Sequence, residues 1–184
     1  MARESRTDYV ILGTLAIEPM SGYDIRSFVE GTIGHFWHES YGQIYPALKR
    51  LAKEGYVTCT VEKQDGRPDR KVYQITADGQ KRLRDWLAVD YEPQPVRHEL
   101  LLKMFFAPAA DKRLLLDQIE REHLFQQEKL ANLEQLRELF LGEFEKDPSH
   151  PWWFATLNYG LHITRARISW CEETLASLRS VVRE

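Results

Sequence analysis

The sequence predicts a mainly α-helical protein with a small β-hairpin, an α+β chain organised in two parts. Apolar residues recur at helical spacing through most of its 184 residues. The exception lies between residues 56 and 75, where two short runs of aromatic and β-branched residues flank a turn rich in Gly and Pro. Pro93 and Pro95 then precede a half in which the spacing is helical throughout. We therefore expect one domain at residues 1–90 and a second, all-helical domain at residues 91–184.

The composition fits a globular protein with enough apolar residues for a packed core, since 43% are hydrophobic and 29% are charged. No apolar run approaches the roughly 18 residues that a membrane-spanning helix needs, and the polar N-terminus does not look like an export signal. Cys59 and Cys171 lie far apart and form no metal-spaced pair. We therefore expect a cytoplasmic protein with reduced thiols and no membrane partner.

Two helices are expected at the N-terminus. The first covers residues 7–18, has a broad apolar face and ends where Pro19 removes a backbone donor. Ser21 is suited to cap the second helix, residues 22–29, because its hydroxyl can accept a hydrogen bond from the first helical turn. Together they precede a Gly-containing connection to a third helix.

The third helix is expected to start near Ser40, a good capping residue, with a slight bend at Pro46, or to start near Gln43. The later start keeps Pro46 within the first turn, where its missing N–H costs least. Gly55 can end the helix in a left-handed conformation. The apolar residues of this helix step by four and three and are expected to face inward: Ile44, Leu48 and Leu51.

The opposite side of the third helix is a candidate surface for reading DNA in the major groove. A Gln side chain can make a paired contact with adenine, and a Lys reaches guanine or phosphate. The alternative is an ordinary solvated helix face. The candidate reading residues are Ser40, Tyr41, Gln43, Tyr45, Lys49 and Arg50.

The hairpin, with strands at residues 56–61 and 72–75, is a candidate wing that lies along the DNA backbone. Asp65 and Asp69 in its turn are unsuited to phosphate and are expected to shape the turn or to pair with Arg70. The alternative is a solvent-exposed charged hairpin without a ligand. The candidate wing residues are Lys63, Arg67, Arg70 and Lys71.

A helix over residues 77–88, capped by Thr76, follows the hairpin. The resulting order of three helices, a hairpin and a helix is that of a winged helix-turn-helix domain. The motifs along this part of the chain are ILG at 11–13, MSGYDI at 20–25, SYGQIYPAL at 40–48 and RPDRKVYQIT at 67–76.

On these motifs, which are specific together, the chain resembles the PadR-like family of bacterial winged-helix transcriptional regulators. The second half is similar, in helix layout and length, to the helical C-terminal domain of the branch that includes virulence-gene activators. The resemblance implies a homodimer that binds double-stranded DNA at an inverted-repeat operator. It also implies a repressor, here of an adjacent operon, that in some members is released by a small aromatic or amphipathic effector.

The distribution of charge is compatible with DNA binding only locally. The net charge is −3, with 13 basic and 13 acidic residues in the first 90 positions and 12 and 15 in the remainder. Basic residues cluster at the end of the third helix and in the hairpin, and local clusters make phosphate contacts. We therefore expect modest DNA affinity per monomer and a need for a dimer.

Tyr23 directly follows the Ser21-Gly22 cap of the second helix. A helix N-terminus attracts phosphate, so Tyr23 and the neighbouring backbone amides are a candidate DNA clamp. The alternative is that Tyr23 packs in the core beneath the third helix. The sequence leaves both open.

The second half is expected to contain helices at residues 96–106, from Asp111 onward and after a turn at residues 147–151. The last helix carries an apolar stripe whose steps alternate between three and four, as in a coiled coil. This stripe packs either on the long helix of the same chain or on a second subunit, and we favour dimerisation. The residues assigned to the dimer seam are Leu157, Leu161, Ile168, Leu175 and Leu178.

Trp152 and Trp153 are unusual at a helix start. They could line an effector pocket, because rigid aromatic rings bury apolar ligands well. They could equally anchor the last helix to the domain core, and the anchor is the favoured interpretation.

No metal, cofactor or catalytic site is expected. His35, His38 and Glu39 lie close together, but their spacing matches no known ligand pattern. No nucleophile–base arrangement, glycine-rich phosphate loop or acidic cluster indicates an enzyme. Two other functions stay open, a winged-helix module for protein contacts and a metal- or thiol-responsive sensor.

Overall fold

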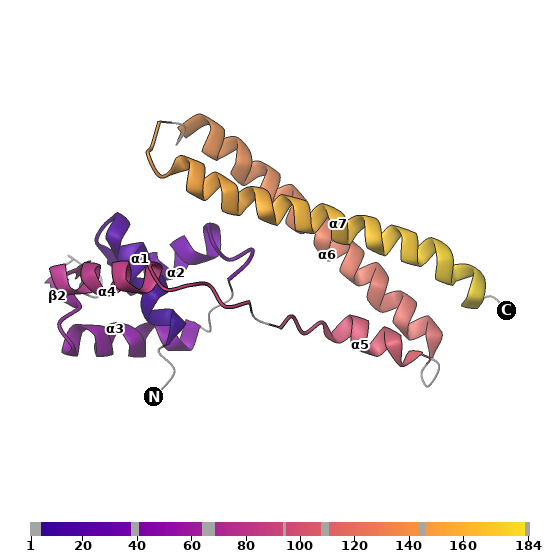
Figure 1. Cartoon of the computed structure of the whole chain (residues 1–184), viewed down its shortest axis with the longest axis horizontal. Helices are drawn as coiled ribbons and strands as arrows, with labels where there is room; N and C mark the ends of the chain where they lie inside the picture. Colours follow the sequence, from indigo (N-terminus) through magenta and orange to yellow (C-terminus); the bar gives the residue numbers. More distant parts are fainter. Residues whose placement is uncertain are drawn as a thin grey trace. The chain divides into compact units, whose positions relative to one another are not determined.

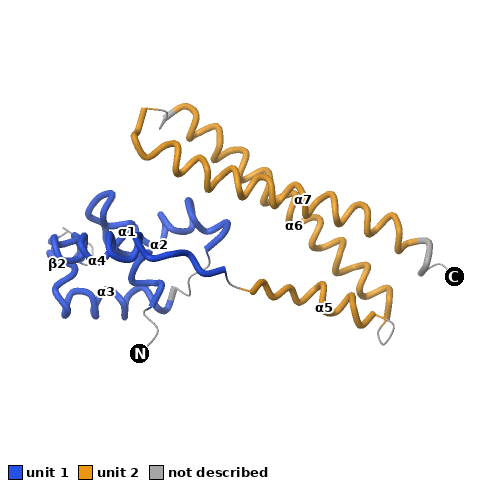
Figure 2. The backbone as a smooth tube through the Cα atoms, in the orientation of Figure 1, with its two compact units in different colours: residues 1–93 blue, residues 94–184 orange. Residues whose placement is uncertain are grey.

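The computed structural model describes residues 5–37, 41–63, 69–93, 95–107, 111–143 and 146–182. The chain divides into two compact units, Met1–Pro93 and Gln94–Glu184 (Figure 2). Among the described residues, no helix is both long and apolar enough to cross a membrane.

The N-terminal unit contains the helices α1 to α4 (Figure 1) and a three-stranded antiparallel sheet. Its elements are α1 (Arg6–Ile17), β1 (Met20–Ser21), α2 (Gly22–Gly31), the 3-10 turn η1 (Tyr41–Gln43), α3 (Ile44–Lys53), β2 (Val57–Glu62), β3 (Arg70–Ile75) and α4 (Ala77–Leu87). The predicted winged-helix order is therefore present, with α3 as its third helix.

The sheet has one strand more than the predicted hairpin. β3 pairs with β2 from Val57↔Ile75 to Glu62↔Arg70, and its other edge pairs with β1, where Met20 lies opposite Tyr73. A two-residue strand is too short to show an alternating pattern, which is why the sequence did not reveal it. β1 ties the start of α2 to the base of the wing.

Local signals in the sequence determine where several elements begin and end. The Ser21 hydroxyl accepts from the Asp24 amide while the Asp24 carboxylate accepts from the Ser21 amide, a complete capping box. Thr76 caps α4 in the predicted way. Gly55 has a φ of 80°, the left-handed conformation that a residue without Cβ adopts at no steric cost. Pro46 falls in the first turn of α3, as expected.

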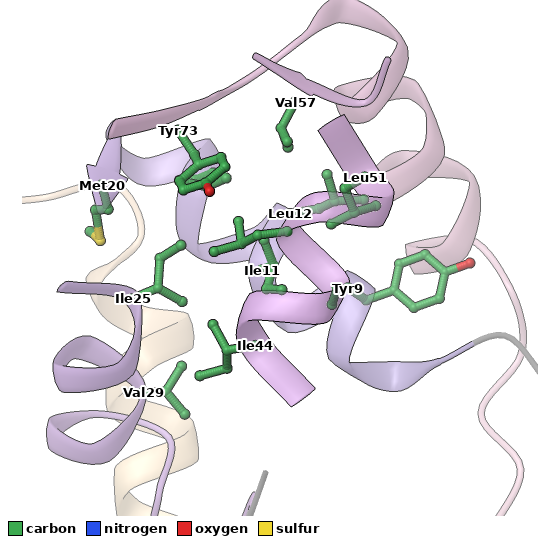
Figure 3. Close-up of a cluster of buried hydrophobic side chains, with 13 residues drawn as sticks. Tyr9, Ile11, Leu12, Met20, Ile25, Val29, Ile44, Leu51, Val57 and Tyr73 are labelled. Atoms are coloured by element: carbon green, nitrogen blue, oxygen red, sulfur yellow. The ribbon is translucent and has the colours of Figure 1, made fainter. Parts of the chain in front are cut away.

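The core of the N-terminal unit lies between α1, α2, α3 and the sheet. Figure 3 shows Ile11 and Leu12 of α1 near the centre of a cluster that also contains Ile25 of α2 and Ile44 of α3. Trp86 of α4 covers this core from outside, with its ring stacked on Tyr9 at a centroid distance of 4.5 Å. Burial of this cluster fixes α3 against the rest of the unit.

The C-terminal unit contains α5 (Glu99–Phe105), α6 (Lys112–Glu143) and α7 (His150–Val182). α5 begins later than predicted, with His98 as its N-cap residue. The Asp111 carboxylate accepts from the Arg113 amide, so Asp111 caps α6 as expected. His150 and Pro151 belong to α7 and not to a turn, because the first turn of a helix tolerates a residue without an N–H.

The apolar stripe of α7 packs within the chain. Leu157 and Leu161 form one cluster with residues of α6, and Leu175 forms another with Ile119 of α6 and Cys171. Leu157, Leu161 and Leu175 are buried in these clusters of the same chain, so the structure corrects their assignment to a subunit interface. Ile168 and Leu178, the other two residues of the predicted dimer seam, are half-buried, and their assignment stays a prediction.

The helix pair is not apolar throughout. Gln126 of α6 is fully buried and donates to Glu122 across 2.8 Å. Arg167 of α7 donates to the same carboxylate and to His98. Burial raises the pKa of the Cys171 thiol beside this group, and the negative Glu122 adds to the shift.

Candidate nucleic-acid interface

The two sides of α3 differ in burial in the predicted way. The exposed fractions of Ile44, Leu48 and Leu51 are 2% or less, and they belong to the core. Tyr45 is 54% exposed, and Lys49 is exposed as well. The inner side of α3 holds the helix to the unit, while the outer side presents hydrogen-bonding and cationic groups to solvent.

Gln43, at the junction of η1 and α3, is exposed, and its side chain is hydrogen-bonded to α1. The Thr7 hydroxyl of α1 donates to Gln43 Oε1 across 3.2 Å, and Thr7 itself is 2% exposed. The Gln43 side chain makes no capping bond to the backbone of α3. The amide is therefore oriented by α1 and not by its own helix.

Arg50 has an internal partner. Its guanidinium pairs with the Asp8 carboxylate of α1, which also pairs with Arg82 of α4. The side chain of Asp8 is 3% exposed, whereas that of Arg50 is 42% exposed. Arg82 also bridges to Glu54 at the end of α3. One buried carboxylate thus joins three helices, and Arg50 contributes to the docking of α3.

Thr7 and Asp8 were not identified as functional residues from the sequence. The available signal was the position of Asp8, one turn before Leu12 and two before Leu15 on the inward face of α1. A carboxylate on an apolar face indicates a buried partner, because an unpaired charge there is costly.

Tyr45 and Tyr23 both lie near the N-terminus of α2. The ring of Tyr45 covers Gly22 so closely that a Cβ there would stand 2.7 Å from Cε1. Burial raises the pKa of Tyr73 on β3, and Cys59 and Tyr45 beside it add to the shift. Tyr23 is 69% exposed, so it does not pack in the core.

The described part of the wing carries exposed cations at Lys63, Arg70 and Lys71. Arg70 donates to the Asp24 carboxylate across 2.6 Å and lies 3.9 Å from Glu62. The partner of Arg70 is thus Asp24 of α2, where the sequence suggested a turn aspartate. Although desolvation opposes it, hydrogen bonds from Ser21 and Arg70 hold the pKa of Asp24 below its usual value.

Some candidate residues lie at the edge of what the structure describes. Ser40 and Arg67 fall outside the described residues. Tyr41 begins η1, directly before α3. Of the described candidates, Gln43, Tyr45 and Lys49 are exposed at the start of α3 and along it.

The grooves in the described parts of the chain include two open ones. One, of about 640 Å³, runs along α2 and is lined by Glu18, Pro19, Met20, Tyr23, Asp24, Ser27, Phe28, Gly31, Thr32 and Arg70. The other, of about 340 Å³, lies between α5 and α6 and is lined by Glu99, Leu100, Lys103, Gln118, Arg121 and Glu122. Trp152 and Trp153 line neither groove.

The two tryptophans at the start of α7 have different surroundings. Trp153 packs edge-on against Phe140 of α6 with a centroid distance of 6.3 Å, as an anchor residue would. Trp152 is 77% exposed. Within the described residues, no three His, Cys, Asp or Glu side chains gather in a way that could hold a metal ion.

Each unit of the chain matches a known family model. The model of the transcriptional regulator PadR-like family matches residues 11–85, and that of the virulence activator alpha C-terminal domain matches residues 96–179. The negative transcriptional regulator PadR of Bacillus subtilis is 32% identical over 92% of this chain and 96% of its own length.

Solved structures of such proteins have the same fold. The crystal structure of Bacillus subtilis PadR in complex with operator DNA matches with a TM-score of 0.80 and 30% identity, covering 95% of this chain and 99% of that one. The structure of the Vibrio cholerae virulence activator AphA matches with a TM-score of 0.77 and 26% identity over 95% and 99%. The chain therefore belongs to the PadR-like family of transcriptional regulators.

Proposed function

We propose that this regulator is a homodimeric repressor that binds an inverted-repeat operator upstream of an adjacent operon. The observation that carries the proposal is the surface of α3, on which Gln43, Tyr45 and Lys49 are exposed above a fully buried apolar side. A similar protein, Bacillus subtilis PadR, was crystallised in complex with operator DNA. Bacillus subtilis PadR, which is 32% identical to this chain, is a negative transcriptional regulator.

The proposed contacts with DNA are of two kinds, those with base edges and those with phosphate. Gln43 and Lys49 face base edges and nearby phosphate in the major groove, where an amide pairs with adenine and an ammonium group with guanine. Tyr45 and the exposed Tyr23 offer hydroxyl groups to phosphate near the N-terminus of α2. Lys63 and Lys71 of the wing provide cations along the backbone. In our proposal Arg50 and Arg70 act mainly within the unit, since both are held by carboxylates.

Dimerisation is assigned to the outward sides of the C-terminal helices. The seam of α7 is occupied by α6, but large apolar side chains remain exposed elsewhere on the unit. A second copy of the unit would remove such side chains from water. The exposed residues on α6 and α7 are Leu114, Leu124, Phe125, Leu139, Leu141, Trp152, Tyr159 and Ile163.

A small aromatic acid is the proposed effector class. Bacillus subtilis PadR, 30% identical to this chain in that comparison, was crystallised with p-coumaric acid. By linkage, a ligand that favours a subunit arrangement with low DNA affinity would release the operator. Titration of the dimer–DNA complex with p-coumaric acid tests this class directly, and an unchanged affinity would exclude that compound.

Binding of the DNA upstream of the protein's own gene, measured by fluorescence anisotropy, tests the proposed interface. Gln43→Ala and Lys49→Ala are each expected to weaken binding roughly 5- to 100-fold, the range of a lost base contact. Lys103→Ala on α5 removes a lysine with a local Glu99 partner and serves as control. Equal affinity of all four proteins would refute the assignment of α3 and favour the protein-contact module.

The remaining alternatives are less well supported. Cys59 is exposed, but Cys171 is buried and its pKa is raised, first by desolvation, so its reactive thiolate is disfavoured. We propose a regulator without catalytic activity, in keeping with its family. Oxidation or chelation that changes operator affinity would instead support a thiol- or metal-responsive sensor.

A further inference from the structure

We propose that Thr7 is a positioning residue that sets the base preference of α3 by holding the amide of Gln43. The inference rests on the proposed function, in which Gln43 faces a base edge. It assigns a role in sequence recognition to α1, whose other contacts described above are the apolar core and the ion pairs of Asp8.

The geometry supports a fixed partner. Thr7 is the second residue of α1, and its hydroxyl donates to Gln43 Oε1 across 3.2 Å. Thr7 is almost completely buried, and α1 is anchored by Ile11, Leu12 and Leu15. Among the described residues, Thr7 is the one hydrogen-bond partner of the Gln43 side chain. The exposed Gln43 side chain is therefore hydrogen-bonded to a helix that is fixed in the core.

The consequence for recognition follows from amide chemistry. A free glutamine samples many rotamers and can exchange the positions of its oxygen and nitrogen. The contact with Thr7 restricts the rotamers of the Gln43 side chain, and with Oε1 on the Thr7 hydroxyl the second lone pair and both N–H donors remain for DNA. An acceptor and a donor side by side match the N6 and N7 positions of adenine, whereas guanine offers two acceptors there.

The docking of α3 has a separate support. Arg50 pairs with Asp8, the residue next to Thr7, and Arg82 holds the same carboxylate. Loss of the Thr7 hydroxyl is therefore expected to leave the ion pairs of Asp8, and with them the packing of α3 on α1, in place. This separation makes the positioning role testable without removing the helix from its place.

The experiment uses the full-length protein and four operator duplexes that differ at one base pair of each half-site. That position is found by scanning the operator with Gln43→Ala and choosing the base pair at which preference is lost. The variants compared are Thr7→Val, which replaces the hydroxyl by a methyl group, Thr7→Ser, which keeps it, Gln43→Ala, and the double variant Thr7→Val with Gln43→Ala. Thermal melting confirms that each protein is folded.

The wild type and Thr7→Ser are expected to prefer adenine by roughly tenfold or more, the range of a paired contact. Thr7→Val is expected to reduce that preference to about twofold or less, and the double variant to behave like Gln43→Ala alone. An unchanged preference in Thr7→Val would overturn the inference. So would an equal loss of affinity for all four duplexes that persists in the Gln43→Ala background, because that is the result of a purely structural role.

The same measurements keep the two proposals apart. A wild type that binds none of the duplexes refutes the proposed function. A wild type that binds, with a base preference that depends on Gln43 but not on Thr7, refutes only the role of Thr7.

Discussion

Arg82 of α4 donates to the carboxylate of Asp8 in α1 across 3.2 Å, although the two residues stand 74 positions apart. The same guanidinium lies over the rings of Tyr9 and Tyr56, at 5.7 and 4.6 Å from their centroids. Arg50 of α3 holds the other oxygen of Asp8. The carboxylate is therefore the point at which the first, third and fourth helices are joined.

Asp8→Asn should destabilise the protein by about 2 kcal/mol. Removing one partner of a fully buried ion pair costs about 3–5 kcal/mol, and the partial exposure of Arg50 lets water compensate part of the loss. Calorimetry of the full chain measures the change. Asp85→Asn, at an exposed pair with Lys81, is the control and should change the stability much less, because water screens an exposed pair. Equal stability of the two variants would contradict the central role of Asp8.

Gly79→Ala should destabilise the N-terminal unit by about 1–3 kcal/mol, the usual range for overpacking. A Cβ at Gly79 would stand 2.2 Å from the backbone oxygen of Tyr56, which cannot move without disturbing the start of β2. The matched control is Gly142→Ala in α6, where a Cβ meets nothing within 4 Å. That change should raise helix stability by about 0.5–1 kcal/mol. Opposite shifts of the two melting curves are the expected result.

The Asp24 carboxylate should make stability depend on acid pH. Although desolvation acts against it, hydrogen bonds from Ser21 and Arg70 lower its pKa in the folded state. The stabilisation is therefore present above the unfolded pKa of about 4 and is lost as the pH falls through the lower folded value. Asp24→Asn should be less stable than the wild type at pH 7, and the gap should narrow below about pH 4. A gap that stays constant down to pH 2 would exclude this carboxylate as its source.

Leu124→Glu should shift the oligomer towards monomer without unfolding the C-terminal unit. Leu124 is 60% exposed on α6, so a charge there is tolerated in the monomer but not in an apolar subunit contact. Leu161→Ala is the contrasting change, because it leaves a cavity between α6 and α7 and should cost about 2–5 kcal/mol of stability. Sedimentation measures the oligomer and thermal melting the stability. A dimer unaffected by Leu124→Glu would place the interface on other residues.

Much of the fold was predictable because its signals are local. Ser21, Thr76 and Asp111 act as helix caps within three residues of their partners, and Gly55 ends α3 through its own backbone freedom. The inward stripe of α3 follows from the helical repeat alone. These signals need no knowledge of the tertiary structure, so the order of elements could be read directly.

The sequence predicted which residues of the candidate site are exposed, but not which of them have partners within the unit. The outward positions of Gln43, Tyr45 and Lys49 follow from the helical repeat. The internal partners of Arg50 and Arg70 do not, because Asp8 and Asp24 lie 42 and 46 residues away and no periodicity connects them. Their charge was assigned to DNA from the sequence, whereas the structure places both guanidinium groups on carboxylates.

The amino-acid sequence by itself determined the family, the winged-helix order of elements and the face of α3 that is free to contact a partner. It did so through spacing, caps and motifs, which act over one or two helical turns. Only the tertiary structure decided that the stripe of α7 packs on α6, that β1 extends the hairpin and that Thr7 holds Gln43. An apolar stripe on a helix indicates that another segment covers it. The sequence does not show which segment that is, because this depends on which elements pack together in the folded chain.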